Sequence, residues 1–223
     1  IITTSKDISK PLQINVSTLL GSFGTVKNNV QIAGKKNKWT YSARLAQTNS
    51  KGFSASIDTT GKNKFDADSY HGTALHGQLN YAATEHFSIK AFSMYNKYKA
   101  GVDAGIFKDD RDFTITNSSL LVGTGFVYKK NNWQITGTYQ HNTLDRHFLN
   151  DSTHKTSTWF EKNDYAAASD YAEIYTSVKL SERLTALAGL DYRNGSYSQN
   201  YLSVSGWGPY NFHDPQTKNC EKC

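Results

Sequence analysis

Apolar and polar residues alternate one by one along most of this chain. From Trp133, the run W-Q-I-T-G-T-Y-Q places Trp133, Ile135 and Tyr139 on one face of an extended strand and polar residues on the other. The same alternation follows Phe87 and Leu184, whereas the three-four spacing of amphipathic helices is scarce. The pattern therefore predicts an all-β protein.

The alternating segments predict nine strands, separated by connections of two kinds. We expect the strands at 12–20, 25–34, 39–47, 71–82, 87–98, 116–128, 133–143, 166–179 and 184–194. Short polar turns at 34–38, 83–86, 129–132 and 180–183 alternate with long loops near 48–70, 99–115 and 144–165. In an up-and-down antiparallel sheet, alternate connections lie at the same end. The sheet is therefore expected to have a short-turn end and a long-loop end.

Composition excludes several classes of protein. No run of about 18 apolar residues is present, so a transmembrane helix is not expected. The 14 Tyr, 11 Phe and 4 Trp are too many aromatic residues for a disordered tail. The net charge of +6 is spread over turns and loops, with no basic run longer than the two residues of Lys35 and Lys36, so no nucleic-acid partner is expected.

Strands of about ten residues with unequal connections at their two ends are typical of an outer-membrane barrel. Aromatic residues also lie close to the short turns, where a bilayer interface would hold them: Trp39, Tyr81, Phe87, Tyr128 and Trp133. A soluble, carbohydrate-binding β-sandwich is an alternative, although its strands are usually shorter. We expect an antiparallel up-and-down meander that forms a partial transmembrane β-barrel, about nine or ten strands of a larger one.

Four segments carry a family resemblance through their order and spacing: I-I-T-T-S-K at 1–6, L-L-G-S-F-G-T at 19–25, N-S-K-G-F at 49–53 and F-D-A-D-S-Y at 65–70. Together they resemble TonB-dependent outer-membrane receptors, nearest the cobalamin-receptor-like group. The resemblance implies that residues 1–10 end a plug domain and that 11–210 form the N-terminal part of the barrel. Residues 211–223 lose the alternation and are expected to be an irregular tail. Since such a barrel has 22 strands of about ten residues each, a chain of 223 residues is expected to be a fragment of it.

The resemblance implies import rather than catalysis. The parent receptor would take up a scarce bulky ligand, cobalamin-like or a metal chelate, across the outer membrane of a Gram-negative bacterium. Its implied partners are outer-membrane lipid, the small-molecule ligand and TonB, the last through a region upstream of this chain. An outer-membrane protease barrel with Asp and His at its loop end is the enzymatic alternative. No nucleophile elbow or phosphate loop is present in the sequence, so we assign no catalytic residues, and ligand-binding residues stay unassigned.

Acidic residues gather in two loops expected at the same end of the sheet. Carboxylates held together repel one another unless they are solvated, paired with residues such as Lys108 or Arg111, or bound to a hard cation. In the cobalamin-receptor-like group, aspartates at matching places bind calcium, while a further acidic position of the group is Ser54 here. The resemblance therefore implies a calcium site, with these residues as ligands: Asp66, Asp68, Asp103 and Asp110.

Cys220 and Cys223 are the only cysteines and form a single C-x-x-C motif. Because a zinc site of this type needs a second pair of ligands, we read the motif as part of an aberrant terminus. The seven histidines include no H-x-x-x-H or H-E-x-x-H spacing, so they predict no zinc site either.

Overall fold

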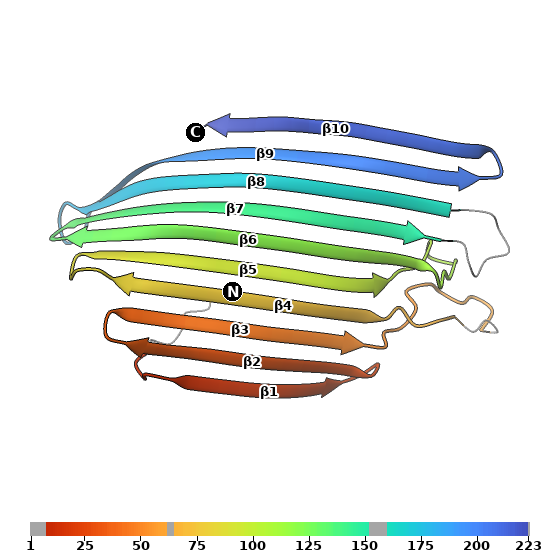
Figure 1. Ribbon diagram of the computed structural model, residues 1–223, viewed down its shortest axis with the longest axis horizontal. Helices are drawn as coiled ribbons and strands as arrows, with labels where there is room; N and C mark the ends of the chain where they lie inside the picture. Colours follow the sequence, from red (N-terminus) through yellow and green to blue (C-terminus); the bar gives the residue numbers. More distant parts are fainter. Residues whose placement is uncertain (1–7, 62–64, 152–159, 223) are drawn as a thin grey trace.

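The computed structural model describes residues 8–61, 65–151 and 160–222, without the side chains of 215–222. Residues 1–7, which hold most of the predicted plug segment, lie outside the described residues, and so does Cys223. Ten strands form one antiparallel sheet in the order of the chain (Figure 1). The strands are β1 (Gln13–Gly21), β2 (Thr25–Lys36), β3 (Trp39–Ser50), β4 (Tyr70–Ala82), β5 (Phe87–Gly101), β6 (Phe113–Lys130), β7 (Trp133–Asn150), β8 (Phe160–Lys179), β9 (Thr185–Ser205) and β10 (Gly208–Lys222).

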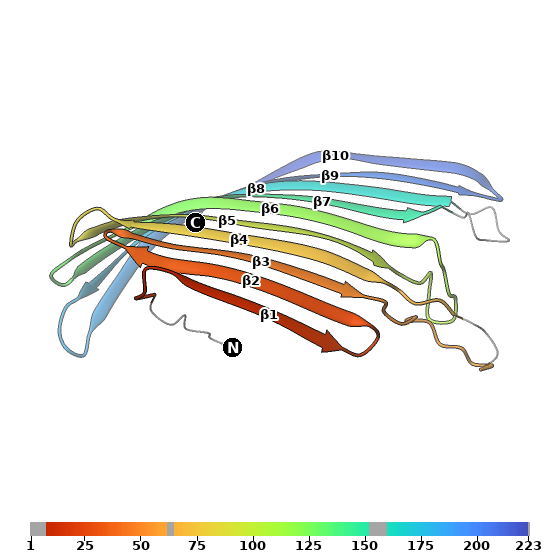
Figure 2. The same ribbon diagram turned by 60° about the horizontal axis from the view of Figure 1, so that its bottom comes forward.

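Each strand pairs with the next one in an unbroken meander, and β1 and β10 form the two edges. No pairing between β1 and β10 is present among the described residues, so the sheet is open. Figure 2 shows that it is a single curved layer. Among the described residues, no helix is long and apolar enough to cross a membrane. The predicted all-β antiparallel meander is confirmed.

The prediction for the last part of the chain was wrong in two respects. Strand β9 continues to Ser205, well beyond the predicted end at 194, and 211–223 is not an irregular tail because β10 occupies most of it. The pairing of β10 with β9 shifts register between Asp214 and Thr217. A bulge of this kind interrupts the side-chain alternation, although backbone pairing continues on both sides of it. The shift accounts for the lost alternation in β10, whereas in β9 beyond 194 polar residues such as Ser196, Ser198 and Gln199 occupy both faces, so the apolar–polar alternation stops although the strand continues.

The two faces of the sheet differ in polarity because the register aligns residues of the same kind across the strands. On one side, here called the apolar face, one row of paired residues crosses β3 to β9: Trp39, Tyr81, Ile89, Phe126, Gly137, Ile174 and Leu190. Another row crosses β1 to β6: Val16, Val30, Leu45, Leu75, Tyr95 and Leu120. Nine of these thirteen residues are exposed large hydrophobic residues. The apolar face is therefore largely uncovered.

The opposite side, here called the polar face, carries hydrogen-bonded polar side chains. Arg44 Nε donates to Asn29 Oδ1 at 2.5 Å, and Arg146 Nε donates to Asn117 Oδ1 at 3.1 Å.

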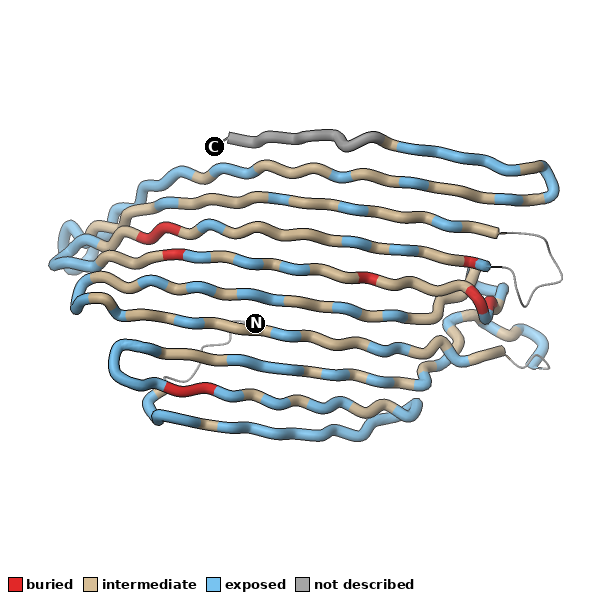
Figure 3. The backbone as a smooth tube through the Cα atoms, in the orientation of Figure 1, coloured by how far each residue is buried: buried red, intermediate tan, exposed pale blue. Residues whose placement is uncertain are grey.

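Figure 3 shows only a few scattered buried positions along the strands. Among the described residues, Ala33 is the only buried apolar residue. A β-sandwich encloses an apolar core between two layers, so the sandwich alternative does not agree with this single layer.

The five aromatic residues noted near the short turns share one face and one end. Trp39 pairs with Tyr81, and their ring centroids are 4.4 Å apart. Phe87 pairs with Tyr128, and Trp133 pairs with Lys130 at the next turn. All five lie on the apolar face at the short-turn end, as the sequence predicts.

Candidate functional site

Two loops at the long-loop end, 51–69 and 102–112, lie side by side because they are joined to the neighbouring strands β4 and β5. The backbone N–H of Gly101 donates to the carbonyl oxygen of Ser69 at 2.9 Å where the loops leave these strands. Gly52 has a φ of +71°, and a Cβ atom there would lie 1.7 Å from the carbonyl oxygen of Asp68. Only glycine fits such a position, so Gly52 allows the first loop to turn tightly against its own return.

Asp103 joins the two loops through its Oδ2, while its Oδ1 is bonded within its own loop. Its Oδ2 accepts hydrogen bonds from Ser54 Oγ at 2.9 Å and from the backbone N–H of Ser56 at 2.7 Å. Its Oδ1 accepts from the backbone N–H of Asp110 at 3.2 Å. Although burial alone would raise it, these hydrogen bonds hold the pKa of Asp103 below its ordinary value. Asp103 is therefore ionised at neutral pH.

Three carboxylates converge beside this junction. Asp66, Asp103 and Asp109 each present an oxygen within 4.8 Å of the others. The backbone N–H of Asp66 also donates to Asp109 Oδ1 at 3.1 Å. The sequence analysis named Asp66 and Asp103 but not Asp109, although the run K-D-D-R-D at 108–112 places Asp109 next to the predicted ligand Asp110.

The two other predicted ligands occupy different surroundings. Asp68 lies next to the cluster, and its Oδ2 accepts a hydrogen bond from the backbone N–H of Ala55 at 3.2 Å. The Asp110 side chain is buried, and its Oδ2 accepts from Asn150 Nδ2 at 2.9 Å. The structure thus directs one oxygen of Asp110 toward the end of β7 and places Asp109 among the three converging acids.

The electrostatics of the cluster favour a bound cation. Burial, together with the neighbouring acids Asp109, Asp68 and Asp103, raises the pKa of Asp66 to about 6. Burial also raises the pKa of Asp68, partly opposed by its hydrogen bond from Ala55. Asp66 Oδ1 is buried and has no hydrogen-bond partner among the described residues. An all-oxygen donor set with an unsatisfied carboxylate oxygen fits a hard cation such as Ca²⁺.

A hollow of about 580 Å³ lies beside the cluster, where the two loops meet the ends of β3 to β5. Its lining includes Phe53, Asp68, Asp103 and Ile106. Phe53 also packs on Phe23 of the β1–β2 turn, with ring centroids 4.9 Å apart. Asp103 thus belongs both to the acidic cluster and to the lining of this hollow.

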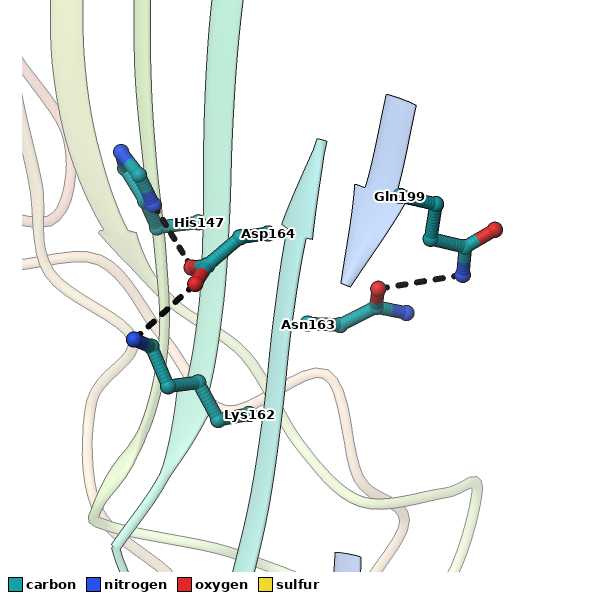
Figure 4. Close-up of polar contacts among 5 residues, drawn as sticks. All are labelled: His147, Lys162, Asn163, Asp164 and Gln199. Atoms are coloured by element: carbon teal, nitrogen blue, oxygen red, sulfur yellow. Dashed lines mark hydrogen bonds and ion pairs between the residues drawn. The ribbon is translucent and has the colours of Figure 1, made fainter. Parts of the chain in front are cut away.

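A second set of polar contacts lies on the long-loop half of the apolar face. Figure 4 shows Asp164 of β8 between His147 and Lys162, which lie 2.7 Å and 2.9 Å from its carboxylate oxygens. The adjacent Asn163 points to the polar face, where Gln199 Nε2 donates to its Oδ1 at 3.1 Å. His141 similarly lies 2.8 Å from Asp170. Both His–Asp pairs lie on the apolar face, not on the polar face. Their position therefore does not support a catalytic role.

Comparison with known proteins concerns the fold. No family model matches the chain, and no curated protein matches it. The ferric yersiniabactin uptake receptor FyuA from Yersinia pestis is similar in structure, with a TM-score of 0.74 and 9% identity over 98% of this chain and 44% of that one. The ferripyoverdine receptor of the Pseudomonas aeruginosa outer membrane has a TM-score of 0.65 and 10% identity over 96% of this chain and 34% of that one. The ferric citrate transporter FecA has a TM-score of 0.62 and 12% identity, with the same coverages of 96% and 34%.

These similarities show that the ten-stranded sheet has the fold of part of an outer-membrane receptor barrel. This confirms the predicted partial barrel. The chain spans less than half the length of the structures it matches. All three are named as receptors or transporters, not as enzymes.

Proposed function

We propose that this chain forms part of the wall of a TonB-dependent receptor in the outer membrane of a Gram-negative bacterium. The receptor imports a bulky ligand, a metal chelate or a cobalamin-like molecule. The observation that carries the proposal is the register-aligned apolar face, which ends in an aromatic row at the short-turn end. Exposing so much apolar surface to water would cost a large free energy, whereas in a bilayer the lipid hydrocarbon covers this surface.

In this assignment the apolar face contacts lipid and the polar face lines the lumen. The Arg44–Asn29 and Arg146–Asn117 hydrogen bonds then lie on the wall of a hydrated interior. The short turns face the periplasm and the long loops face the exterior, which is the usual arrangement of bacterial outer-membrane barrels. The loops that hold the acidic cluster are thus on the side from which a ligand arrives.

We also propose that the acidic cluster binds calcium. Asp66, Asp103 and Asp109 supply the converging oxygens, with Asp68 beside them. Asp110 would join the site through a shift of its side chain or would support it through Asn150. A bound calcium ion would neutralise the acids that now raise the pKa of Asp66, and would thereby order both loops over the external opening.

Two classes of ligand are supported by different observations. The three similar receptors are named for ferric yersiniabactin, ferripyoverdine and ferric citrate, which supports a ferric chelate. The resemblance of the sequence supports a cobalamin-like ligand. Titration of the purified receptor with a ferric siderophore and with a corrinoid, each followed by tryptophan fluorescence, would distinguish the two.

The membrane assignment is tested by fluorescence quenching in lipid vesicles. Trp39 and Trp133 lie on the apolar face at the short-turn end, whereas Trp207 in the β9–β10 turn is fully exposed. Lipids brominated near the headgroup should quench Trp39 and Trp133, so Trp39→Phe and Trp133→Phe should each remove part of the quenched signal. Trp207→Phe is the control and should remove only fluorescence that iodide in the water quenches. Equal removal by all three variants would contradict the assignment.

A further inference from the structure

A polar groove on the apolar face lies directly beyond the apolar rows of β3 to β6. Its volume is about 620 Å³, and most of its lining side chains belong to the apolar face, including Gln47, His71, Lys97, Lys99 and Thr116. Toward the short turns, the next residues on that face are Leu45 on β3 and Leu75 on β4, whereas on β6 Ser118 precedes Leu120; Tyr95 of β5 lies at the border. The groove therefore begins where the apolar surface ends.

The position of the groove corresponds to the outer interface of a bilayer. Asn49, His71 and Lys97 each lie ten residues along their strand from an aromatic residue of the short-turn end, namely Trp39, Tyr81 and Phe87 respectively. A tilted transmembrane strand needs about 9–11 residues to cross the hydrocarbon. If the aromatic row marks the inner interface, these three side chains are at the level of the outer headgroups.

The groove carries positive charge, and no acidic side chain in its lining neutralises that charge. Lys97 and Lys99 are both exposed, on the same face of β5 and two residues apart. No acidic residue lines the groove, and the nearest acid in the row of Lys97 is Asp145, two strands away. His71 is paired with Lys99 across β4 and β5, and its Nδ1 lies 3.0 Å from Asn49 Oδ1. Two ammonium groups, an imidazole and neighbouring hydroxyl and amide groups thus face one space.

The contrast with the next cation on this face is informative. Lys162 of β8 lies 2.9 Å from Asp164, which also contacts His147 (Figure 4). In that part of the apolar face, Lys162 is paired with an acidic residue of the protein itself, so it needs no external anion. In the groove, by contrast, the protein supplies cations and hydrogen-bond donors without an acid.

From these observations we propose that the groove binds the phosphate group of a membrane lipid in the outer leaflet. Lys97 and Lys99 contact the phosphate, while Asn49, His71 and Thr116 supply hydrogen bonds to it or to the adjoining headgroup. The acyl chains of the same lipid lie along Leu45, Leu75 and Leu120. An amphiphile satisfies both halves of this surface, whereas a free phosphate ion would satisfy only the polar half.

The inference rests on the proposed membrane location, and its test is arranged so that the two can fail separately. The purified receptor in uncharged detergent is titrated with dioleoyl phosphatidic acid or dioleoyl phosphatidylcholine, and bound lipid is counted by native mass spectrometry. We expect phosphatidic acid to bind more tightly than phosphatidylcholine. The double variant Lys97→Gln/Lys99→Gln should weaken its binding roughly tenfold or more. The control variant Lys162→Gln, at an ion pair on the same face, should bind it as the wild type does.

Three results would overturn the proposal: equal binding of the two lipids, unchanged binding by the double variant, or displacement of phosphatidic acid by an equal concentration of inorganic phosphate. Circular dichroism of each variant shows whether the sheet is intact, and the single variants Lys97→Gln and Lys99→Gln provide a milder change if the double variant does not fold. Quenching of Trp39 and Trp133 by brominated lipid is measured separately, on the same protein preparations after reconstitution in lipid vesicles. If that quenching is present while the lipid preference is absent, only the lipid site is wrong; if quenching is absent, the membrane assignment itself fails.

Discussion

The backbone N–H of Ser56 donates a hydrogen bond of 2.7 Å to Oδ2 of Asp103, although 47 residues separate the two in the chain. The same oxygen accepts a second hydrogen bond from Ser54 Oγ. Hydrogen bonds to an ionised carboxylate are stronger than those between neutral groups. The protein itself therefore holds the two loops together at this point, and a bound cation would add to an arrangement that is already in place.

Replacement of Asp103 should loosen the first loop. Asp103→Ala removes the acceptor for Ser54, Ser56 and Asp110, and should lower the free energy of local opening of 51–69 by roughly 2–3 kcal/mol. Amide hydrogen exchange of this loop measures the change. Glu182→Ala, in the short turn between β8 and β9 at the other end of the sheet, is the matched control. Unchanged protection of 51–69 in the Asp103 variant would show that other contacts fix the loop.

Calcium binding should depend on the converging acids. Asp66→Asn and Asp109→Asn each remove one charged oxygen donor from the cluster, and should each weaken calcium binding roughly tenfold or more, as measured by isothermal titration calorimetry. Asp145→Asn changes the charge equally but lies on β7, outside the cluster, and should leave the affinity unchanged. Absence of calcium binding by the wild type at millimolar concentrations would refute the metal site and leave the hydrogen-bonded loops intact.

Without calcium, the loops should become more stable as the pH is lowered from 7 to 5. Burial and neighbouring acids raise the pKa of Asp66 to about 6 in the folded protein, against 3.8 for an ordinary aspartate. The folded state then binds a proton more tightly than the unfolded state, so protonation favours folding as the pH falls through 6 toward 4. Hydrogen exchange of 51–69, corrected for the intrinsic pH dependence, should show greater protection at pH 5. Asp66→Asn should remove most of the effect, and saturating calcium should reverse it because protons compete with the ion.

The sequence predicted the sheet well because successive side chains of a strand point to opposite faces. Apolar residues at every second position therefore identify the apolar face directly. It predicted the aromatic row for the same reason, since Trp39 and Tyr81 are adjacent in register once the short turns are located. Strand β10 escaped prediction because the register shift between Asp214 and Thr217 breaks the period. The choice between Asp109 and Asp110 could not be predicted, since successive side chains point in different directions and only the path of the loop decides which one turns inward.

Gly52 offers a test of how the loop path supports the acidic cluster. Gly52→Ala would place a Cβ atom 1.7 Å from the carbonyl oxygen of Asp68 at a φ of +71°, so the loop must move. We expect a local destabilisation of about 2 kcal/mol or more and weaker calcium binding, measured by hydrogen exchange and calorimetry. Gly105→Ala is the control, because no atom lies within 4 Å of its added Cβ and the substitution should be nearly neutral. Wild-type calcium affinity in the Gly52 variant would show that the cluster tolerates a different loop path.

The orientation of the sheet in the membrane can be tested with two adjacent residues of β3. Ala43 lies on the apolar face, four residues from Trp39, and Ser42 lies on the polar face. Ala43→Arg places a charge in the hydrocarbon if the apolar face contacts lipid, and should destabilise the protein in vesicles by about 2–4 kcal/mol. Ser42→Arg adds the same group to the hydrated interior and should change the stability by less than about 1 kcal/mol. Urea unfolding in vesicles, followed by tryptophan fluorescence, measures both. A larger loss for Ser42→Arg would place lipid against the opposite face and would invert the assignment of wall and lumen.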